Sequence, residues 1–187
     1  MLSWLSHKLQ EVEKLSDLFL IKRVKRGDRD AFGKLYLKYL DAIYRYIYFR
    51  VNQDQVVAED LTETVFFKAW ENVKNFKENS GTFKAWLYMI AQNTVIDHYR
   101  KPQKTVQSDE NFIHETDNIE EKLMNEYEIK NLNQALSYLT DEQREVIILK
   151  YIEEASNEEI GKILNKKEDA VRAMQHRALE KLRKILK

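Results

Sequence analysis

The sequence predicts an all-α protein built from two small helical domains. Only four glycines and one proline occur in 187 residues, whereas sheets with tight hairpins use these residues at their turns. Hydrophobic residues make up 43% of the chain, enough to form a core, and they recur at helical spacing. Charged residues make up 33%, which suits a soluble helical protein with short polar connections.

The composition also limits the chemistry and the compartment. The chain has no cysteine, which excludes disulfides, thiolate nucleophiles and cysteine-based metal sites, and which is compatible with a reducing cytoplasm. Apolar runs such as residues 146–149 fall far short of the roughly 20 residues that span a bilayer. Lys8, Glu11 and Glu13 stand where a signal peptide needs an apolar stretch. We expect a cytoplasmic protein.

The first half of the chain carries three apolar stripes with a period of 3.6 residues. One stripe runs through residues 31–51, a second helix begins near Asp54, and a third stripe runs through residues 83–95. A weaker helix over about Leu15–Lys25 ends near Gly27. Helices of this kind bury their stripes against one another, so residues 1–101 are predicted to form one domain.

An acidic segment separates this domain from a second one. It follows the only proline, Pro102, and residues 102–127 contain seven acidic and two basic side chains without a sustained period. Such a segment is long for a connection inside one compact domain. We therefore divide the chain into a domain at 1–101, a linker at 102–122 and a second domain at 123–187.

The second domain contains the signals of a helix-turn-helix. Thr140–Gln143 and Ser156–Glu159 have the sequence of capping boxes, each ahead of an apolar run. Asn165 tolerates the left-handed conformation that ends a helix, and the acids Glu168 and Asp169 suit the start of the next one. Two short helices joined by a three-residue turn are typical of DNA-binding proteins, and of many that never touch DNA.

The last helix has two distinct sides. At 100° per residue, a predicted buried seam contains Val171, Met174, Ala178, Leu182 and Ile185. The opposite side carries Asp169, Arg172, Ala173, His176 and Arg177, and residues 162–187 hold nine basic and three acidic side chains. A small residue flanked by arginines suits a helix that enters the major groove. An ordinary solvated helix face explains the pattern equally well.

The sequence resembles the extracytoplasmic-function (ECF) sigma factors in both halves. Leu139–Leu182 resembles their C-terminal promoter-binding domain, and Gly27–Lys101 resembles their first conserved domain. Within the latter, GDRDAFGKLYLKY is similar to the opening helix and VVAEDLTETVFFKAW to the polymerase-binding helix. NFKENSGTFKAWLYMIAQNTVIDHYRK is similar to the promoter-melting element. The two domains stand in family order, which is more specific than either match alone.

The resemblance implies a transcription initiation factor with no enzymatic activity and no cofactor. Its implied partners are core RNA polymerase, through the clamp helices of the largest subunit and the flap of the second-largest, and promoter DNA; an anti-sigma factor is left open. The implied polymerase contacts are Asp60, Glu63 and Phe67. The implied contacts to melted −10 DNA are Phe76, Lys77, Asn79, Ser80, Lys84, Asn93, His98, Arg100 and Lys101. The implied contacts to −35 duplex are Lys166, Lys167, Asp169, Arg172, Ala173, His176 and Arg177.

Several positions depart from the family pattern. Glu63 and Thr64 stand where Gln-Glu is usual in the polymerase-binding helix, and Gln92 stands where an Arg is frequent. The helix-turn-helix differs from the usual residues at Asn165, Lys166, Lys167, Ala170, Met174 and Gln175. These differences put the promoter sequence beyond prediction, while the class of protein follows from the two domains together.

Other functions were weighed against this one. A two-component regulator with the same helix-turn-helix needs a receiver domain of alternating strands and helices, and residues 1–101 predict helices only. An enzyme is disfavoured because the four histidines are scattered without metal-binding spacing and the single glycines form no phosphate loop. An inactive sigma-like regulator stays open, as does the choice between an inert linker and one that runs through the polymerase cleft.

Overall fold

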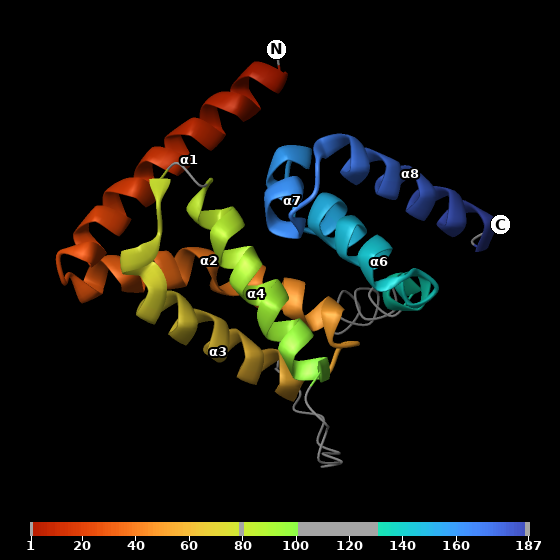
Figure 1. The fold of residues 1–187 in the computed structure, drawn as a ribbon, viewed down its shortest axis with the longest axis horizontal. Helices are drawn as coiled ribbons and strands as arrows, with labels where there is room; N and C mark the ends of the chain where they lie inside the picture. The colour runs from red at the N-terminus through yellow and green to blue at the C-terminus, as the bar shows by residue number, and fades with distance from the viewer. Residues whose placement is uncertain (1, 79–80, 101–130, 186–187) are drawn as a thin grey trace, which may run out of the picture.

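The computed structural model describes residues 2–78, 81–100 and 131–185, and for residues 2–11, 13 and 14 it describes the backbone alone. All regular elements in these ranges are helices, arranged as two domains (Figure 1). The first domain contains α1 (Leu2–Lys25), α2 (Arg29–Arg50), α3 (Gln55–Asn72), the 3-10 turn Val73–Asn75 and α4 (Phe83–Arg100). The second contains a helical segment at 131–137, α6 (Asp141–Ile147), a π-helical turn (Ile148–Ile152), α7 (Asn157–Leu164) and α8 (Glu168–Ile185).

The predicted helix start near Asp54 is confirmed by its cap, and α2 begins at a cap of the same kind. Asp28 accepts a hydrogen bond from the Ala31 amide at 3.1 Å, and Asp54 accepts one from the Val57 amide at 3.0 Å. Helix α1 begins at Leu2, not near Leu15, because residues 2–25 contain no glycine or proline that would interrupt it. It ends before Gly27, whose φ of 96° closes the turn.

Aromatic rings join the helices of the first domain. The ring centroids of Phe32 and Trp70 lie 5.0 Å apart, and those of Tyr36 and Phe66 lie 4.7 Å apart. Both ring pairs are edge-to-face and join α2 to α3. The fully buried Ile43, Ile47 and Val65 complete this core. Helix α2 therefore packs against α1, α3 and α4.

The second domain confirms both capping boxes. Gln143 and Glu159 each accept a hydrogen bond from the backbone of the N-cap residue, and Thr140 and Ser156 accept one in return. Asn165 ends α7 with φ 51° and ψ 47°, the predicted left-handed conformation. The turn passes so close to α7 that a Cβ on Gly161 would lie 2.7 Å from the Lys166 carbonyl oxygen.

The two domains pack directly against each other. Helix α7 packs on α4, and the π-helical turn packs on α2, so the second domain lies against these two helices of the first (Figure 1). One core cluster of buried side chains includes residues of both domains. The predicted linker at 102–122 and the predicted domain start near 123 lie outside the described residues.

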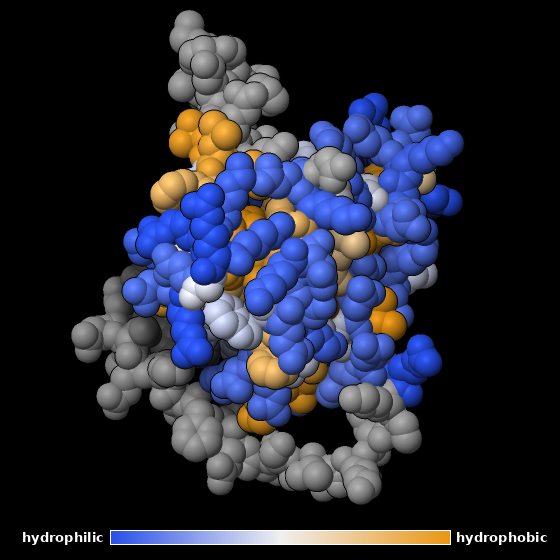
Figure 2. Space-filling view, turned by 60° about the vertical axis from the view of Figure 1, so that its left-hand side comes forward, coloured by the Kyte–Doolittle hydropathy of each residue, from blue (hydrophilic) through white to orange (hydrophobic). Residues whose placement is uncertain are grey.

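The face drawn in Figure 2 is mainly hydrophilic with scattered hydrophobic side chains. In the ranges that the structure describes, no helix is long and apolar enough to cross a membrane. The same ranges contain no group of three or more His, Cys, Asp or Glu side chains that could hold a metal ion.

Candidate nucleic-acid and protein interfaces

One exposed face of α3 combines apolar and acidic side chains. The three residues predicted for protein binding, Asp60, Glu63 and Phe67, are all exposed, and Phe67 retains 62% of its accessible surface. Val56 (44% exposed) and Trp70 (37% exposed) continue the row, because steps of four and three residues return to the same side of a helix. Sequence reasoning missed these two, although the repeated spacing would have included them.

The predicted −10 residue Phe76 is in the core. Its ring is 2% exposed and packs edge-to-face on Phe83 and Trp86, with centroids 5.9 and 5.5 Å away. The ring therefore offers no free face on which a base could stack. The predicted contact of Phe76 with −10 DNA is not supported by this structure, in which Phe76 packs in the core. Trp86 packs on the same cluster, in agreement with its predicted place in the apolar stripe. Asn79, Ser80 and Lys101 lie outside the described residues.

The other predicted −10 residues divide between two environments. Asn93 and Arg100 are exposed, and because they are seven residues apart they lie on the same side of α4. Lys77 is exposed as well, and His98 is half-buried beside Tyr99. Lys84 is different: its Nζ donates to the backbone carbonyl of Glu153 in the second domain at 3.3 Å. Part of the expected nucleic-acid surface is thus covered by the second domain.

Helix α8 has the two sides that its sequence predicts. Val171, Met174 and Ala178 are buried, and the residues of the opposite side are all exposed: Asp169, Arg172, Ala173, His176 and Arg177. The seam ends earlier than predicted, because Ile185 is 37% exposed in the last turn, where no described element covers it. The basic side chains Arg172, His176 and Arg177 therefore face solvent along the first three turns of the helix.

Several basic side chains of this surface lie beside exposed carboxylates. Arg172 pairs with Glu168 at 3.0 Å, and His176 lies 3.8 Å from Glu180, each one helical turn away. In the turn before α8, Lys166 pairs with Glu142 at 2.9 Å. Solvent-exposed pairs contribute little free energy, so phosphate groups could displace these carboxylates at small cost.

Together these features define a two-domain helical protein with a helix-turn-helix and a separate exposed face of apolar and acidic side chains on α3. Family models match in both halves: Sigma-70 region 2 over residues 35–105 and Sigma-70 region 4 over residues 135–184. The ECF RNA polymerase sigma factor SigW of Bacillus subtilis is 36% identical over 179 residues, with 89% of this chain and 95% of SigW covered. The chain belongs to the ECF family of RNA polymerase sigma factors, which direct core RNA polymerase to specific promoters.

Other comparisons agree in fold and differ in length. The ECF sigma factor BldN of Streptomyces coelicolor is 33% identical over 175 residues. The matched region covers 89% of this chain and 64% of the length of BldN. The structure of CnrH in complex with the cytosolic domain of CnrY matches with a TM-score of 0.72, 24% identity, and coverage of 91% of this chain and 97% of CnrH. At this identity the match shows the shared fold.

Proposed function

We propose that this chain brings core RNA polymerase to promoters through three surfaces with separate tasks. The α3 face docks on the polymerase, the exposed side of α4 captures melted −10 DNA, and α8 reads the −35 duplex. Bacterial transcription takes place in the cytoplasm, which is where the proposal places the chain. No catalytic step is assigned to it.

The docking task rests on the exposed Phe67 and Trp70 beside two carboxylates. Aromatic side chains at the centre of an interface dominate its binding energy, and flanking charges set orientation and specificity. Phe67 forms a row of exposed apolar side chains with Val56 and Trp70 on this helix face, and contiguous exposed apolar side chains mark sites of protein–protein interaction. Asp60 and Glu63 would then pair with basic groups on the clamp of the polymerase.

The DNA tasks rest on two different kinds of contact. Arg172 and Arg177 on α8 reach outward, as side chains that read guanine edges or grip phosphates must, and Ala173 between them lets the backbone come close. Asn93 on α4 offers donors and an acceptor for the edge of an unpaired base. Arg100, on the same side, supplies a charge for the strand backbone.

The single observation that carries the proposal is the joint presence of both sigma regions, with an exposed basic face on α8. The test is run-off transcription with purified core polymerase on a library of genomic fragments from the bacterium that encodes the chain. We expect co-elution with core enzyme and initiation at a defined set of start sites. A chain that co-elutes without supporting initiation would instead act as an inactive sigma-like regulator.

The proposal includes an anti-sigma protein as a second partner. Two proteins of similar fold were solved as complexes. CnrH is bound to the cytosolic domain of CnrY, and the sigma factor RpoE from Bartonella quintana is bound to the anti-sigma factor NepR. Affinity purification of the tagged chain from cells, with and without the Phe67→Ala substitution, would show whether a protein other than polymerase uses the same α3 face.

A further inference from the structure

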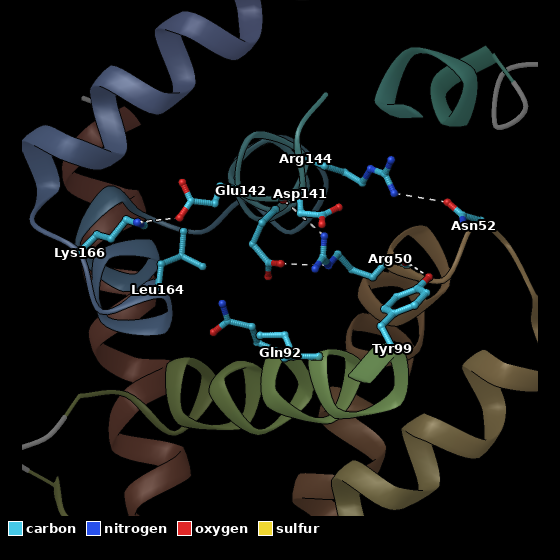
Figure 3. A pocket seen from close by; sticks show the side chains of 11 residues that line it. Arg50, Asn52, Gln92, Tyr99, Asp141, Glu142, Arg144, Leu164 and Lys166 are labelled. Atoms are coloured by element: carbon cyan, nitrogen blue, oxygen red, sulfur yellow. Dashed lines mark hydrogen bonds and ion pairs between the residues drawn. The ribbon is translucent and has the colours of Figure 1, made fainter. Parts of the chain in front are cut away.

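The cleft between the two domains satisfies its own charges. It has a volume of about 600 Å³, and side chains of α2, α4 and α6 line it (Figure 3). Each of its three cations is bound by another side chain of the same chain: Arg50 by Glu145, Arg144 by Asn52 and Lys166 by Glu142. A ligand would have to displace these partners. One side of α1 is different, because no element in the described ranges covers it.

Helix α1 has an apolar side that is exposed to solvent. Val12, Leu15 and Phe19 retain 63%, 66% and 62% of their accessible surface, although all three are large and apolar. At about 100° per residue they lie on one side of the helix. The N-terminal end of α1 extends beyond the other helices of the first domain (Figure 1). Contiguous apolar surface of this kind marks a site of interaction.

The first domain binds the opposite side of α1. Asp17, Ile21 and Val24 are 3%, 1% and 3% exposed, and by the same rotation they lie about half a turn away from Val12 and Phe19. The Asp17 carboxylate accepts a hydrogen bond from Lys38 Nζ of α2 at 2.6 Å. The contacts of α1 with its own domain therefore leave the apolar side accessible.

The accessible side has the spacing of a coiled-coil seam. Alternating steps of three and four residues keep one row of side chains facing a partner helix. In α1 this row contains Leu2, Leu5, Leu9, Val12, Ser16 and Phe19. Only Ser16 in the row is polar, and Asp17, Ile21 and Val24 occupy outer positions of the same heptads. A second helix could therefore pack on the seam while each α1 keeps its contacts with its own domain.

Charges beside the seam favour a parallel pair of identical helices. In a parallel coiled coil, a residue on one flank of the seam faces the residue about five positions further along in the other helix. Lys8 and Glu13 stand at two such positions, so a symmetric pair brings each Lys8 to the Glu13 of the other copy. The next flanking pair is Leu15 with Leu20, which are both apolar. An antiparallel pair would place Lys8 beside Leu15 instead.

A membrane surface fits this helix less well. Helices that lie on membranes carry many Lys and Arg side chains on their polar side, which attract anionic lipids. Residues 2–20 contain two basic side chains, Lys8 and Lys14, and three acidic ones, Glu11, Glu13 and Asp17. This part of α1 has a slight excess of negative charge, so an anionic surface would not attract it.

We propose that the chain self-associates through α1 as a parallel two-helix coiled coil, in which Val12 and Phe19 meet the same residues of a second copy. The seam covers fewer than three heptads, and short helical pairings are marginally stable. The dimer should therefore form with micromolar affinity, so that single chains predominate at low concentration. Polymerase binding can then be measured on single chains, and the inference does not depend on the proposed function.

Sedimentation equilibrium of the full-length chain, from low to high micromolar concentration, tests the proposal. We expect an equilibrium between monomer and dimer. Val12→Asp should weaken it about tenfold or more, because the symmetric seam would bury two like charges beside each other. Since Val12 is exposed in the single chain, the circular dichroism spectrum should not change. Leu37→Asp is the matched control, because Leu37 is 73% exposed on α2, and it should leave self-association unchanged.

An exchange of charges beside the seam tests the parallel register. Lys8→Glu and Glu13→Lys should each weaken self-association, because like charges then face each other. An equimolar mixture of the two variants should associate more tightly than either variant alone, since opposite charges face each other again. A mixture that associates no more tightly than the separate variants would overturn the parallel pair.

Two further outcomes would refute self-association through α1. One is a chain that stays monomeric at high micromolar concentration, and the other is a dimer that persists in Val12→Asp. Vesicles of phosphatidylglycerol test the rival surface, and they should not bind the chain. Vesicle binding that Val12→Asp abolishes, by a chain that is monomeric in solution, would assign the apolar side of α1 to a membrane.

Discussion

The hydroxyl of Tyr46 donates a hydrogen bond to the carboxylate of Glu145, and the two residues are 0% and 3% exposed. They lie 99 positions apart, one in each domain. Because the low-dielectric surroundings strengthen the bond and penalise its loss, this pair couples the stability of the two domains to their contact. Its chemistry leads to the first two predictions.

Tyr46→Phe should lower the free energy of unfolding by about 1–3 kcal/mol, because one oxygen of a buried carboxylate loses its donor. Urea unfolding followed by circular dichroism measures the change. Tyr138→Phe is the matched control: Tyr138 is 47% exposed, and its substitution should change stability little. Equal effects of the two substitutions would show that the Tyr46 hydroxyl is not important for stability.

The free energy of unfolding should depend on pH through Glu145. Burial raises the pKa of its carboxyl above the ordinary value of 4.5, although Arg50 and Tyr46 oppose the shift and Asp141 adds to it. In the unfolded chain the carboxyl returns to water, so unfolding releases a proton between 4.5 and the raised pKa of the folded state. Raising the pH through this window therefore favours unfolding, and lowering it favours the folded state.

Urea unfolding followed by circular dichroism, repeated from about pH 5 to about pH 8, measures this dependence. Glu145→Gln removes the titrating group and should flatten the curve in this window. A curve that keeps its slope in Glu145→Gln would assign the pH dependence to another group.

Phe67→Ala should weaken binding to core polymerase by about 2 kcal/mol or more, because an aromatic anchor is lost from the interface. Phe19→Ala provides a close control, since Phe19 is also 62% exposed and lies on α1, away from the proposed docking face. Competition against a labelled sigma factor measures both affinities. Equal affinities of the two variants would mean that α3 does not dock on the polymerase.

Asn93→Ala should impair promoter opening more than binding to closed duplex, because the amide is proposed to read the edge of an unpaired base. Permanganate reactivity of melted thymines reports opening, and gel shift at low temperature reports the closed complex. Asn72→Ala, at an exposed Asn on α3, controls for loss of a surface amide. Loss of both steps together would indicate that Asn93 acts through general DNA affinity.

Arg172→Ala should relax sequence preference at one −35 position at a cost of about 1–3 kcal/mol, whereas Lys167→Ala should weaken all sequences alike and reduce the salt slope by about one. Arg183→Ala, at an exposed position in the last turn of the same helix, is the control. It should leave the preference among promoter sequences unchanged. Titrations against single-base promoter variants at two salt concentrations distinguish these outcomes. If Arg172→Ala keeps full discrimination, this residue does not read bases.

Features that depend on local chemistry could be predicted from the sequence without the fold. Capping boxes, the left-handed Asn165 and the helical spacing of apolar residues involve neighbours within about four positions, so they can be recognised without knowing the fold. For the same reason the exposed side of α8 and the three docking residues on α3 were predicted correctly as surface positions. The family resemblance, carried by both halves, then supplied the class of protein.

Features that depend on partners far away in the chain could not be predicted before the tertiary structure was known. Phe76 appears available for stacking in the sequence, but Phe83 and Trp86 of the next helix enclose its ring. In the sequence, Glu153 cannot be distinguished from an acid of a solvated loop. Only the fold brings Arg45, 108 positions away, into contact with it. The burial and the ion pairs of Glu145 and Glu153 and the contact of Lys84 with the second domain arise only when the two domains meet, because the free energy of a charged group depends on which groups replace its water.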